Sequence, residues 1–539
     1  MNINKILKNF FHFYGIIKHN EKKFVKKSIN SDNQILIEFN NFCSSHIGLS
    51  YCANILKKKY NANIIGYSGH VLLSFPLKRG IISKILYFFG KNLGLNFFGV
   101  YKSFGTKKFI LPEPNDKIFK LALKSFQKFK NKVKNLKDLE NFKIKKVYIG
   151  DYLYDTYLKK NYNLEPTIDL KSKNFLDFAY DFLILFEYWD NYFKTNKVKA
   201  IISSHAVYVM GLILRIGLKY KSKSYILTHD QLWQLNKKQP RQFYEVNNFK
   251  KIFRKLNRPI KKNLLDKSKR KINTRLDGKY TSDYGYITKS PYGFGNKLNF
   301  NKKNKNIFVI ATHDFVDAPH AMGNSIFPDF YQWFIKLCEF SLKTKDIWLV
   351  KNHPDFGEDY SQYVKYERDV TKHALKNFPN IKLLDKKTTL NDLVKINVDA
   401  VFTVNGTIGF DFAILGIPVI NASLNNPHIN YGFNSHPRNE TQLKNIIFNF
   451  KKNKIKIKKK DLYEYYAMRN IYFSKNWFYE DLDKVIREIG SYHNLSKPEF
   501  YSYWKKQYKV FDEKKVIGNL KKYFNSNKVF LLNKSYTNY

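Results

Sequence analysis

Residues 399–422, DAVFTVNGTIGFDFAILGIPVINA, predict a strand, a turn, a helix and a second strand in immediate succession. Residues 400–404 are apolar and partly β-branched, which is typical of a buried parallel strand. Gly416 and Pro418 are the residue types that end a helix and prevent its continuation. The segment therefore predicts one repeat of an α/β fold with a parallel sheet.

The turn within this segment, Asn405-Gly406-Thr407, predicts a phosphate site. Glycine lets the backbone approach a ligand closely, and the Thr407 hydroxyl and the amides at the start of a helix attract an anion. Asp411 lies one turn further along, where its carboxylate could accept hydrogen bonds from ribose hydroxyls. The same residues also build an ordinary strand–turn–helix joint, so the turn alone leaves both interpretations open.

Strand and helix patterns alternate along the whole chain, which predicts an α/β fold of two Rossmann-like domains facing a cleft. In the second half we expect strands at 307–311, 347–350, 381–384, 400–404 and 418–420, and helices at 330–342, 360–375 and 390–396. In the first half we expect strands at 35–39, 63–67, 147–150, 200–204 and 225–228, and helices at 47–59, 117–137, 175–193 and 207–220.

The basic, Asn-rich stretch 299–306 reads as a linker and sets the predicted domain boundaries. We expect an N-terminal, acceptor-side α/β domain at 1–298, a donor-binding domain at 306–480, and a helical tail at 481–539 that packs back on the first domain. The charged segment 250–271 is interpreted as an irregular lobe of the first domain.

The amino-acid composition narrows the classes of partner that the protein is expected to bind. Lys and Arg number 95 against 44 Asp and Glu, a formal charge of +51, and the excess Lys is partly what AT-rich codon usage produces. An anionic membrane face or a phosphorylated substrate fits this charge better than nucleic acid, because no nucleic-acid-binding motif is present. The three cysteines, Cys43, Cys52 and Cys338, have no metal-type spacing.

No apolar run is long enough to span a bilayer, so we expect a cytoplasmic protein. Residues 3–17 and 78–98 interleave Lys with aliphatic and aromatic side chains. Such stretches lie on anionic membrane surfaces or pack as ordinary helices on a domain. A peripheral position on the inner face of the cytoplasmic membrane is therefore one prediction.

A second motif, Lys351-Asn352-His353-Pro354, directly follows the predicted strand 347–350. Its imidazole could donate to a phosphate oxygen, Pro354 would fix the turn, and Lys351 would add a positive charge. A histidine that only caps the turn is the alternative. Because this motif and the turn at Asn405 leave the same edge of the predicted sheet, we expect one anion site there.

The pair KNHP (351–354) and TVNGTIGFDFAILGIPVI (403–420) resembles the bacterial capsular and surface polysaccharide glycosyltransferases, which include Kdo transferases. More distantly, it is similar to polysialyltransferases and CDP-glycerol glycerophosphotransferases. The match covers about residues 305–450, and it implies the GT-B architecture, no catalytic metal and no cofactor beyond the donor. The resemblance implies donor-phosphate roles for His353, Pro354, Thr403, Asn405, Gly406 and Thr407. Such proteins usually have Glu where this chain has Asp411, whose shorter side chain reaches less far.

The loop 311–320, ATHDFVDAPH, follows the first strand of the second half. The resemblance implies donor-sugar or acceptor contacts for His313 and Asp317. Metal ligation by His313, Asp317 and His320 is an alternative, although the resemblance implies a metal-independent enzyme.

Four polar residues of the first half follow predicted strands, where an acceptor would enter: His46, Asp151, His205 and Asp230. Each is a candidate general base, and each could also be a satisfied polar residue at a strand end. We rank His205 first, because the strand and helix on either side of it are the best defined.

The sequence thus predicts a glycosyltransferase that moves a sugar from a nucleotide-activated donor, with CMP-linked sugars as one candidate, to a surface polysaccharide or lipid-linked glycan. The alternatives are a glycerophosphotransferase, a nucleotide-sugar epimerase, and a non-catalytic polysaccharide-assembly protein on the same fold.

Overall fold

The strands predicted in the second half form a five-stranded parallel sheet in the computed structural model, in the order β11-β10-β9-β12-β13. Their bounds are β9 Ile307–Ala311, β10 Ile347–Lys351, β11 Ile381–Leu383, β12 Ala400–Thr403 and β13 Val419–Asn421. β10 and β11 lie to one side of β9, and β12 and β13 to the other. The direction of winding therefore reverses between β9 and β12, and in such sheets the ligand binds at this switch point, outside the carboxyl ends of the strands.

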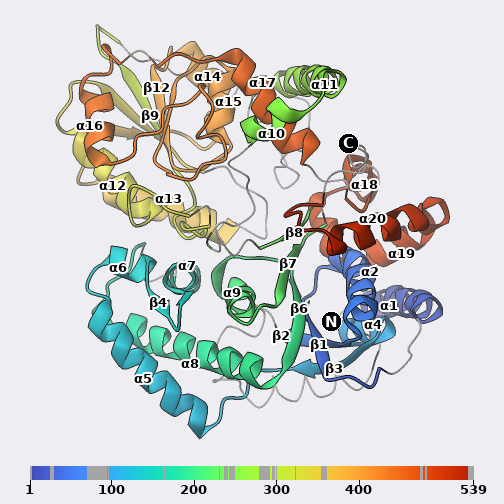
Figure 1. Ribbon diagram of the computed structural model, residues 1–539. Coiled ribbons are helices and arrows are strands. Elements are labelled where there is room, and N and C mark those ends of the chain that lie inside the picture. The colour runs from blue at the N-terminus through green and yellow to red at the C-terminus, as the bar shows by residue number, and fades with distance from the viewer. Residues whose placement is uncertain are drawn as a thin grey trace. The chain divides into compact units, whose positions relative to one another are not determined.

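The structure describes residues 3–24, 29–68, 94, 96–161, 166–229, 231–235, 241, 249–277, 292–293, 298, 300, 302–321, 323–353, 361–453, 455–473, 477–479 and 482–531. The chain divides into two units (Figure 1). Unit 1 comprises Met1–Leu153, Leu170–Pro240 and Ser474–Tyr539, and unit 2 comprises Tyr154–Asp169 and Arg241–Phe473.

Helices cover both faces of the unit 2 sheet. Phe308 and Ile310 share a buried apolar cluster with Trp333 of α12, whereas Val309 packs on the opposite face with Leu393 of α14. The helices are α10 Phe249–Lys255, α11 Arg258–Leu276, α12 Phe330–Ser341, α13 Ser361–Leu375, α14 Leu390–Lys395, α15 Ile408–Ile414, α16 Glu440–Phe448 and α17 Lys459–Ala467, which continues into the π-helical turn η6 Met468–Tyr472.

Unit 1 contains a six-stranded sheet in the order β3-β2-β1-β6-β7-β8. The strands are β1 Asn33–Phe39, β2 Asn63–Ser68, β3 Thr106–Ile110, β6 Lys197–Ser203, β7 Lys223–Leu227 and the antiparallel β8 Leu232–Gln234. Its winding reverses between β1 and β6, so this sheet also has a switch point at its carboxyl edge. The chain is therefore α/β, with a Rossmann-like sheet in each unit.

The helices of unit 1 come from both ends of the chain. From the N-terminal part they are α1 Ile3–Lys23, α2 Cys43–Tyr60, α4 Phe97–Ser103, α5 Asp116–Lys132, α6 Leu136–Glu140, α7 Gly150–Lys160 (which passes into unit 2), α8 Lys173–Thr195 and α9 Leu212–Lys219. From the C-terminal part they are α18 Leu482–Ile489, α19 Glu499–Gln507 and α20 Glu513–Asn525. Tyr501 and Trp504 of α19 are buried in one core with Leu56 of α2. Among the described helices, none has the length and apolarity required to cross a membrane.

The boundaries differ from the prediction: Tyr154–Asp169 and the residues from Arg241 onward belong to unit 2 instead of the first domain, and unit 2 ends at Phe473 instead of at residue 480. The segment 250–271, interpreted as irregular, forms α10 and most of α11. Ile260, Leu264 and Ile272 are buried at intervals of four and eight residues along α11, and the Ser268 hydroxyl donates to the Tyr463 carbonyl of α17. The apolar stripe is narrow and Lys and Arg occupy eight of the nineteen positions of α11, which made the helix hard to identify.

The strand predicted at 147–150 is shorter than expected and does not belong to the main sheet. Val147–Tyr148 (β5) pairs only with Lys143–Ile144 (β4) in a two-stranded sheet, and Gly150 already begins α7. Asp151 consequently does not lie at the carboxyl edge of the main sheet.

Candidate functional site

The turn at Asn405 is held in place by its two neighbouring strands and by a defined helix end. Thr403 is buried at the last position of β12, where its carbonyl accepts a hydrogen bond from the Ala422 amide beside β13. α15 ends in a Schellman motif, in which Ile417 N donates to Phe412 O and Gly416 adopts a φ of 83°. The predicted stop signal is therefore used, and the chain returns directly into β13.

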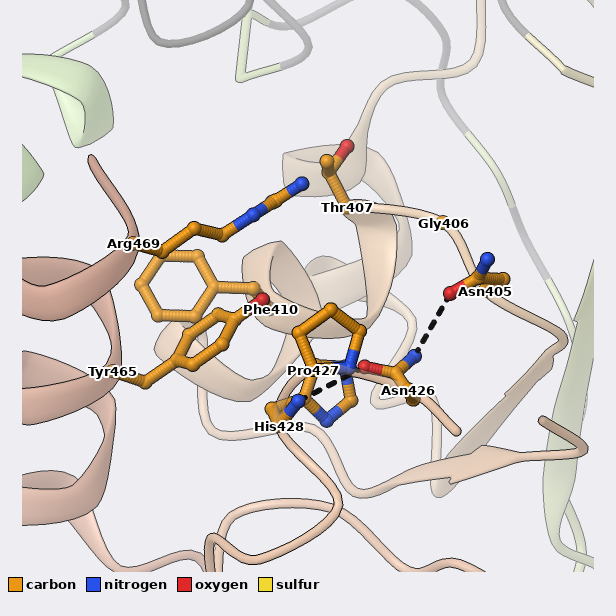
Figure 2. Close-up of a pocket in the computed structure, with 9 residues that line it drawn as sticks. All are labelled: Asn405, Gly406, Thr407, Phe410, Asn426, Pro427, His428, Tyr465 and Arg469. Atoms are coloured by element: carbon orange, nitrogen blue, oxygen red, sulfur yellow. Dashed lines mark hydrogen bonds between the residues drawn. The ribbon is translucent and has the colours of Figure 1, made fainter. Parts of the chain in front are cut away.

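A pocket opens beside this turn, at the carboxyl edge of the unit 2 sheet (Figure 2). Three segments line it: the turn after β12 with the first part of α15, the loop after β13, and the end of α17 with its π turn. The lining residues are Asn405, Gly406, Thr407, Phe410, Asn426, Pro427, His428, Tyr465 and Arg469. Among these described residues only Arg469 carries a fixed charge and none is acidic, so the lining favours an anion.

Hydrogen bonds fix the two loops against each other. Asn426 Nδ2 donates to Asn405 Oδ1 at 3.4 Å, and the backbone N–H of His428 donates to Asn426 Oδ1 at 3.2 Å. Figure 2 shows the Arg469 side chain extending across the pocket toward Thr407. The amides and the guanidinium thus border the same small volume.

The histidine of this pocket is neutral. Burial lowers the pKa of His428 well below its ordinary value, and the nearby His436 and Arg469 lower the pKa further. His428 Nδ1 lies 3.2 Å from His436 Nε2, and burial lowers the pKa of His436 to about 4. Arg469 is therefore the cation that the pocket offers at neutral pH.

An aromatic wall completes the pocket. The ring centroid of Tyr465 lies 5.8 Å from that of Phe410 and 5.4 Å from that of His428. Aromatic faces beside a guanidinium suit a phosphate that carries a planar or ring-shaped substituent. The π turn that presents Arg469 is a local widening of the helix, which is frequent at functional sites.

The turn differs from the prediction in two respects. α15 has seven residues, so its dipole is that of a helix of fewer than two turns, and Thr407 makes no capping hydrogen bond through its side chain. The positive character of the pocket thus comes mainly from Arg469, which the sequence prediction did not include.

Asp411 does not have the predicted freedom to bind ribose. It is buried, and its carboxylate accepts hydrogen bonds from Arg275 Nε at 3.0 Å, Arg275 Nη2 at 2.9 Å and the Tyr292 hydroxyl at 2.7 Å. These contacts join α15 to α11. The physical reason for the correction is that both carboxylate oxygens are already used in a buried ion pair.

The motif at 351–354 forms a second cluster at the same edge of the sheet, since β9 lies between β10 and β12. The His313 ring centroid lies 4.7 Å from that of Phe330 and 5.4 Å from that of His353. Two of the predicted histidines are thus adjacent, and an aromatic ring supports them. Pro354 lies outside the described residues.

Glu367 of α13 organises this second cluster. Its buried carboxylate accepts hydrogen bonds from the His353 amide at 3.3 Å, from Asn352 Nδ2 at 3.1 Å and from the Thr312 hydroxyl. Burial raises the pKa of Glu367 to about 7, against the effect of these donors. One carboxyl therefore ties the end of β9 to the end of β10.

Other predicted residues of this edge point elsewhere. Lys351 Nζ donates to the Thr388 carbonyl at 2.7 Å, and burial lowers the pKa of Lys351 to about 8. Asp317 is exposed, whereas His320 is buried with its Nδ1 2.6 Å from Asp155 Oδ1. Within the described part of the chain, no three His, Cys, Asp or Glu side chains are grouped to hold a metal ion.

Two of the four base candidates in unit 1 are structural. His46 is buried, with Nδ1 2.6 Å from the Tyr501 hydroxyl and Nε2 3.0 Å from Asn40 Oδ1, and burial lowers its pKa to about 3. Asp151 is buried in a bidentate ion pair with Arg215, at 2.6 and 2.7 Å. Neither is placed to accept a proton from an incoming hydroxyl.

His205 stays a candidate base. It follows β6 at the carboxyl edge of the unit 1 sheet, is half-buried, and its Nδ1 lies 3.0 Å from the Ser204 hydroxyl. Asp230 lies outside the described residues.

Five residues of unit 2 were missed at the sequence level: Glu367, Asn426, His428, Tyr465 and Arg469. Asn426 and His428 lie five and seven residues beyond the end of β13, so a rule that selects residues directly after a strand does not reach them. Glu367, Tyr465 and Arg469 lie on helices and carry no spacing signal that links them to the turn.

No protein-family model matches the chain, and no curated protein matches its sequence. Among solved structures, the beta Kdo 2,4 transferase KpsC of Thermosulfurimonas dismutans is 12% identical, with a TM-score of 0.32 over 51% of this chain and 79% of that chain. The beta Kdo 2,7 transferase KpsC of the same organism is 14% identical, with a TM-score of 0.28 over 56% and 83%. The UDP-GlcNAc 2-epimerase of Methanocaldococcus jannaschii, solved with UDP-GlcNAc and UDP, is 11% identical, with a TM-score of 0.23 over 81% and 97%.

Proposed function

We propose that unit 2 binds a nucleotide-activated sugar and that the chain transfers this sugar to a hydroxyl group of a surface polysaccharide or lipid-linked glycan. One observation carries the proposal: the pocket at the carboxyl edge of the sheet, beside the switch point, is bordered by Arg469 and by amide and hydroxyl groups, without a carboxylate. This is the chemistry that a phosphate ester requires.

In the proposed reaction the acceptor oxygen attacks the anomeric carbon of the donor while the bond from that carbon to the phosphate oxygen breaks. Arg469 stabilises the negative charge that develops on the departing nucleotide phosphate, and the neutral His428 contributes no charge of its own. The proton of the acceptor hydroxyl passes to a base, for which His205 is the candidate. Positioning and leaving-group stabilisation then supply most of the rate enhancement.

We also propose that the chain works beside an anionic membrane surface. α1 buries Phe13 and Ile16 in unit 1, while Phe11 and Tyr14 are 67% and 48% exposed. Lys18 Nζ lies 5.8 Å from the centroid of the exposed Tyr14 ring. Exposed aromatic rings beside lysines suit the interface of an anionic bilayer. The second basic stretch, 78–98, lies largely outside the described residues.

The test is a thermal-shift series with CMP, CDP, UDP and GDP, because a ligand that binds only the folded state stabilises it. We expect at least one nucleotide to raise the melting temperature of unit 2, and His353→Ala, at the same sheet edge, to reduce that shift. An absence of stabilisation by all four nucleotides would contradict the proposal and favour a polysaccharide-assembly protein. Incubation with the matching labelled nucleotide sugar then separates transfer from epimerisation by the product formed.

A further inference from the structure

A second cavity lies in unit 1, at the switch point between β1 and β6. β1 ends at Phe39 and β6 at Ser203, and the two strands are direct parallel neighbours. The cavity is lined by Glu38, Asn40, Ser45, Leu49, Ile202, Ser203, Ser204 and Leu227. It thus occupies in this sheet the place where a doubly wound fold binds its ligand.

Glu38 is the unusual member of this lining, because only one of its two carboxylate oxygens is satisfied. The residue is 1% exposed, and its Oε2 accepts hydrogen bonds from the Ser204 amide at 2.5 Å and from the Ser203 hydroxyl at 3.1 Å. Its Oε1 is buried and has no hydrogen-bond partner among the described residues. No Lys, Arg or His of the described chain forms an ion pair with it.

A buried carboxylate oxygen that accepts no hydrogen bond destabilises the folded protein. A bound ligand that donates a hydrogen bond to Glu38 Oε1 would remove this cost. The side chain of Asn40, two residues further along the chain, is oriented by two contacts to its amide oxygen. The Phe42 amide donates to Asn40 Oδ1 at 3.0 Å, and His46 Nε2 lies 3.0 Å from the same oxygen. Because these contacts occupy the amide oxygen, the Asn40 NH₂ group is the part of that side chain left for a ligand.

We infer that this cavity, which has room for about one water-sized group, binds a single hydroxyl group of a carbohydrate, with Glu38 Oε1 accepting the hydroxyl hydrogen and Asn40 Nδ2 donating to the hydroxyl oxygen. The inference deepens the proposed function, on which it rests, by naming the acceptor-sugar contact in unit 1. A carboxylate disfavours phosphate, so this cavity selects a neutral polyol, whereas the Arg469 pocket of unit 2 selects an anion.

The test is binding of fluorescently labelled protein to a printed array of bacterial surface oligosaccharides and methyl glycosides of glucose, galactose and N-acetylglucosamine. Wild type is expected to bind a subset of the glycans, and Glu38→Gln to bind them at least about tenfold more weakly, as expected for loss of a hydrogen bond to a charged group. Glu113→Gln removes a carboxylate from the exposed surface of unit 1 and should leave binding unchanged.

A matched serine pair keeps the test independent of the stability of the Glu38 variant. Ser45→Ala removes a hydroxyl of α2 that lines the cavity and donates to the Phe42 carbonyl at 2.8 Å. Ser50→Ala removes a hydroxyl of the same helix that does not line the cavity and donates to the Ile47 carbonyl at 2.7 Å. We expect about two- to tenfold weaker glycan binding for Ser45→Ala only. If wild type bound no glycan, or if Glu38→Gln bound as well as Glu113→Gln, the inference would be overturned. Nucleotide thermal shifts on the same samples report separately on the proposed function of unit 2.

Discussion

Replacing Asp411 with Asn is expected to destabilise unit 2 strongly and to leave nucleotide binding in place. Asp411 and Arg275 are only 4% and 5% exposed, and the carboxylate accepts two hydrogen bonds from the guanidinium and one from Tyr292. The substitution leaves the Arg275 charge buried without a counter-charge, which costs about 3–5 kcal/mol in comparable pairs. For a unit of this size the melting temperature should fall by roughly 6–20 °C.

Differential scanning calorimetry with and without the stabilising nucleotide measures both parts of this prediction. Asp369→Asn, an exposed position of α13, is the matched control and should melt like wild type. The double variant Arg275→Met/Asp411→Leu should recover much of the loss, because it removes both buried charges. A variant Asp411→Asn that melts within about 2 °C of wild type, yet binds nucleotide more weakly, would refute the structural role and restore the ribose-binding hypothesis.

Three further results are expected. The pKa of Glu367 is raised from 4.5 to about 7, so its contribution to stability is fully present below pH 4.5 and is lost as the pH rises through 7, a fall of about 3 kcal/mol. The buried histidines titrate equally in both proteins, so the difference in unfolding free energy between wild type and Glu367→Gln should fall by this amount between pH 4 and 8, and a constant difference would contradict the prediction. His46→Leu should destabilise unit 1 by about 1–3 kcal/mol through its lost hydrogen bonds, without changing nucleotide affinity in titrations; unchanged stability would contradict its role as a core residue. His205→Ala should slow sugar transfer by about 10²–10⁴-fold at unchanged melting temperature and donor affinity, and an unaffected rate would remove it as the base.

The sheet of unit 2 could be predicted because each strand is a short apolar run between clear helix signals. Gly416 and Pro418 marked the end of α15, and the structure uses them there. β3 could not be found in the same way, since its sequence TKKFI places lysines on an exposed edge of the sheet. α11 was missed because only a narrow stripe of its residues is buried and nine of its nineteen residues are charged.

The site was predictable only where it directly follows a strand. Asn405 to Thr407 and His353 were identified by that rule, whereas Arg469 reaches the pocket from a π turn about sixty residues further along the chain. The rule also cannot tell a satisfied polar residue from an unsatisfied one. His46 and Glu38 lie near the same strand end, yet both ring nitrogens of His46 are hydrogen-bonded in the core, whereas Glu38 Oε1 has no hydrogen-bond partner among the described residues. That difference depends on partners such as Tyr501, which only the folded chain brings together.

The most direct test of the account is the affinity of the Arg469 pocket for the nucleotide that stabilises unit 2, measured by isothermal titration calorimetry. Arg469→Ala should weaken that affinity by about 10–150-fold, the value of a charge-assisted hydrogen bond to phosphate. Arg438→Ala removes an exposed guanidinium of the same unit and should bind as wild type does. Equal affinities for wild type and Arg469→Ala, or equal losses in the two arginine variants, would contradict the claim that this pocket holds the donor phosphate.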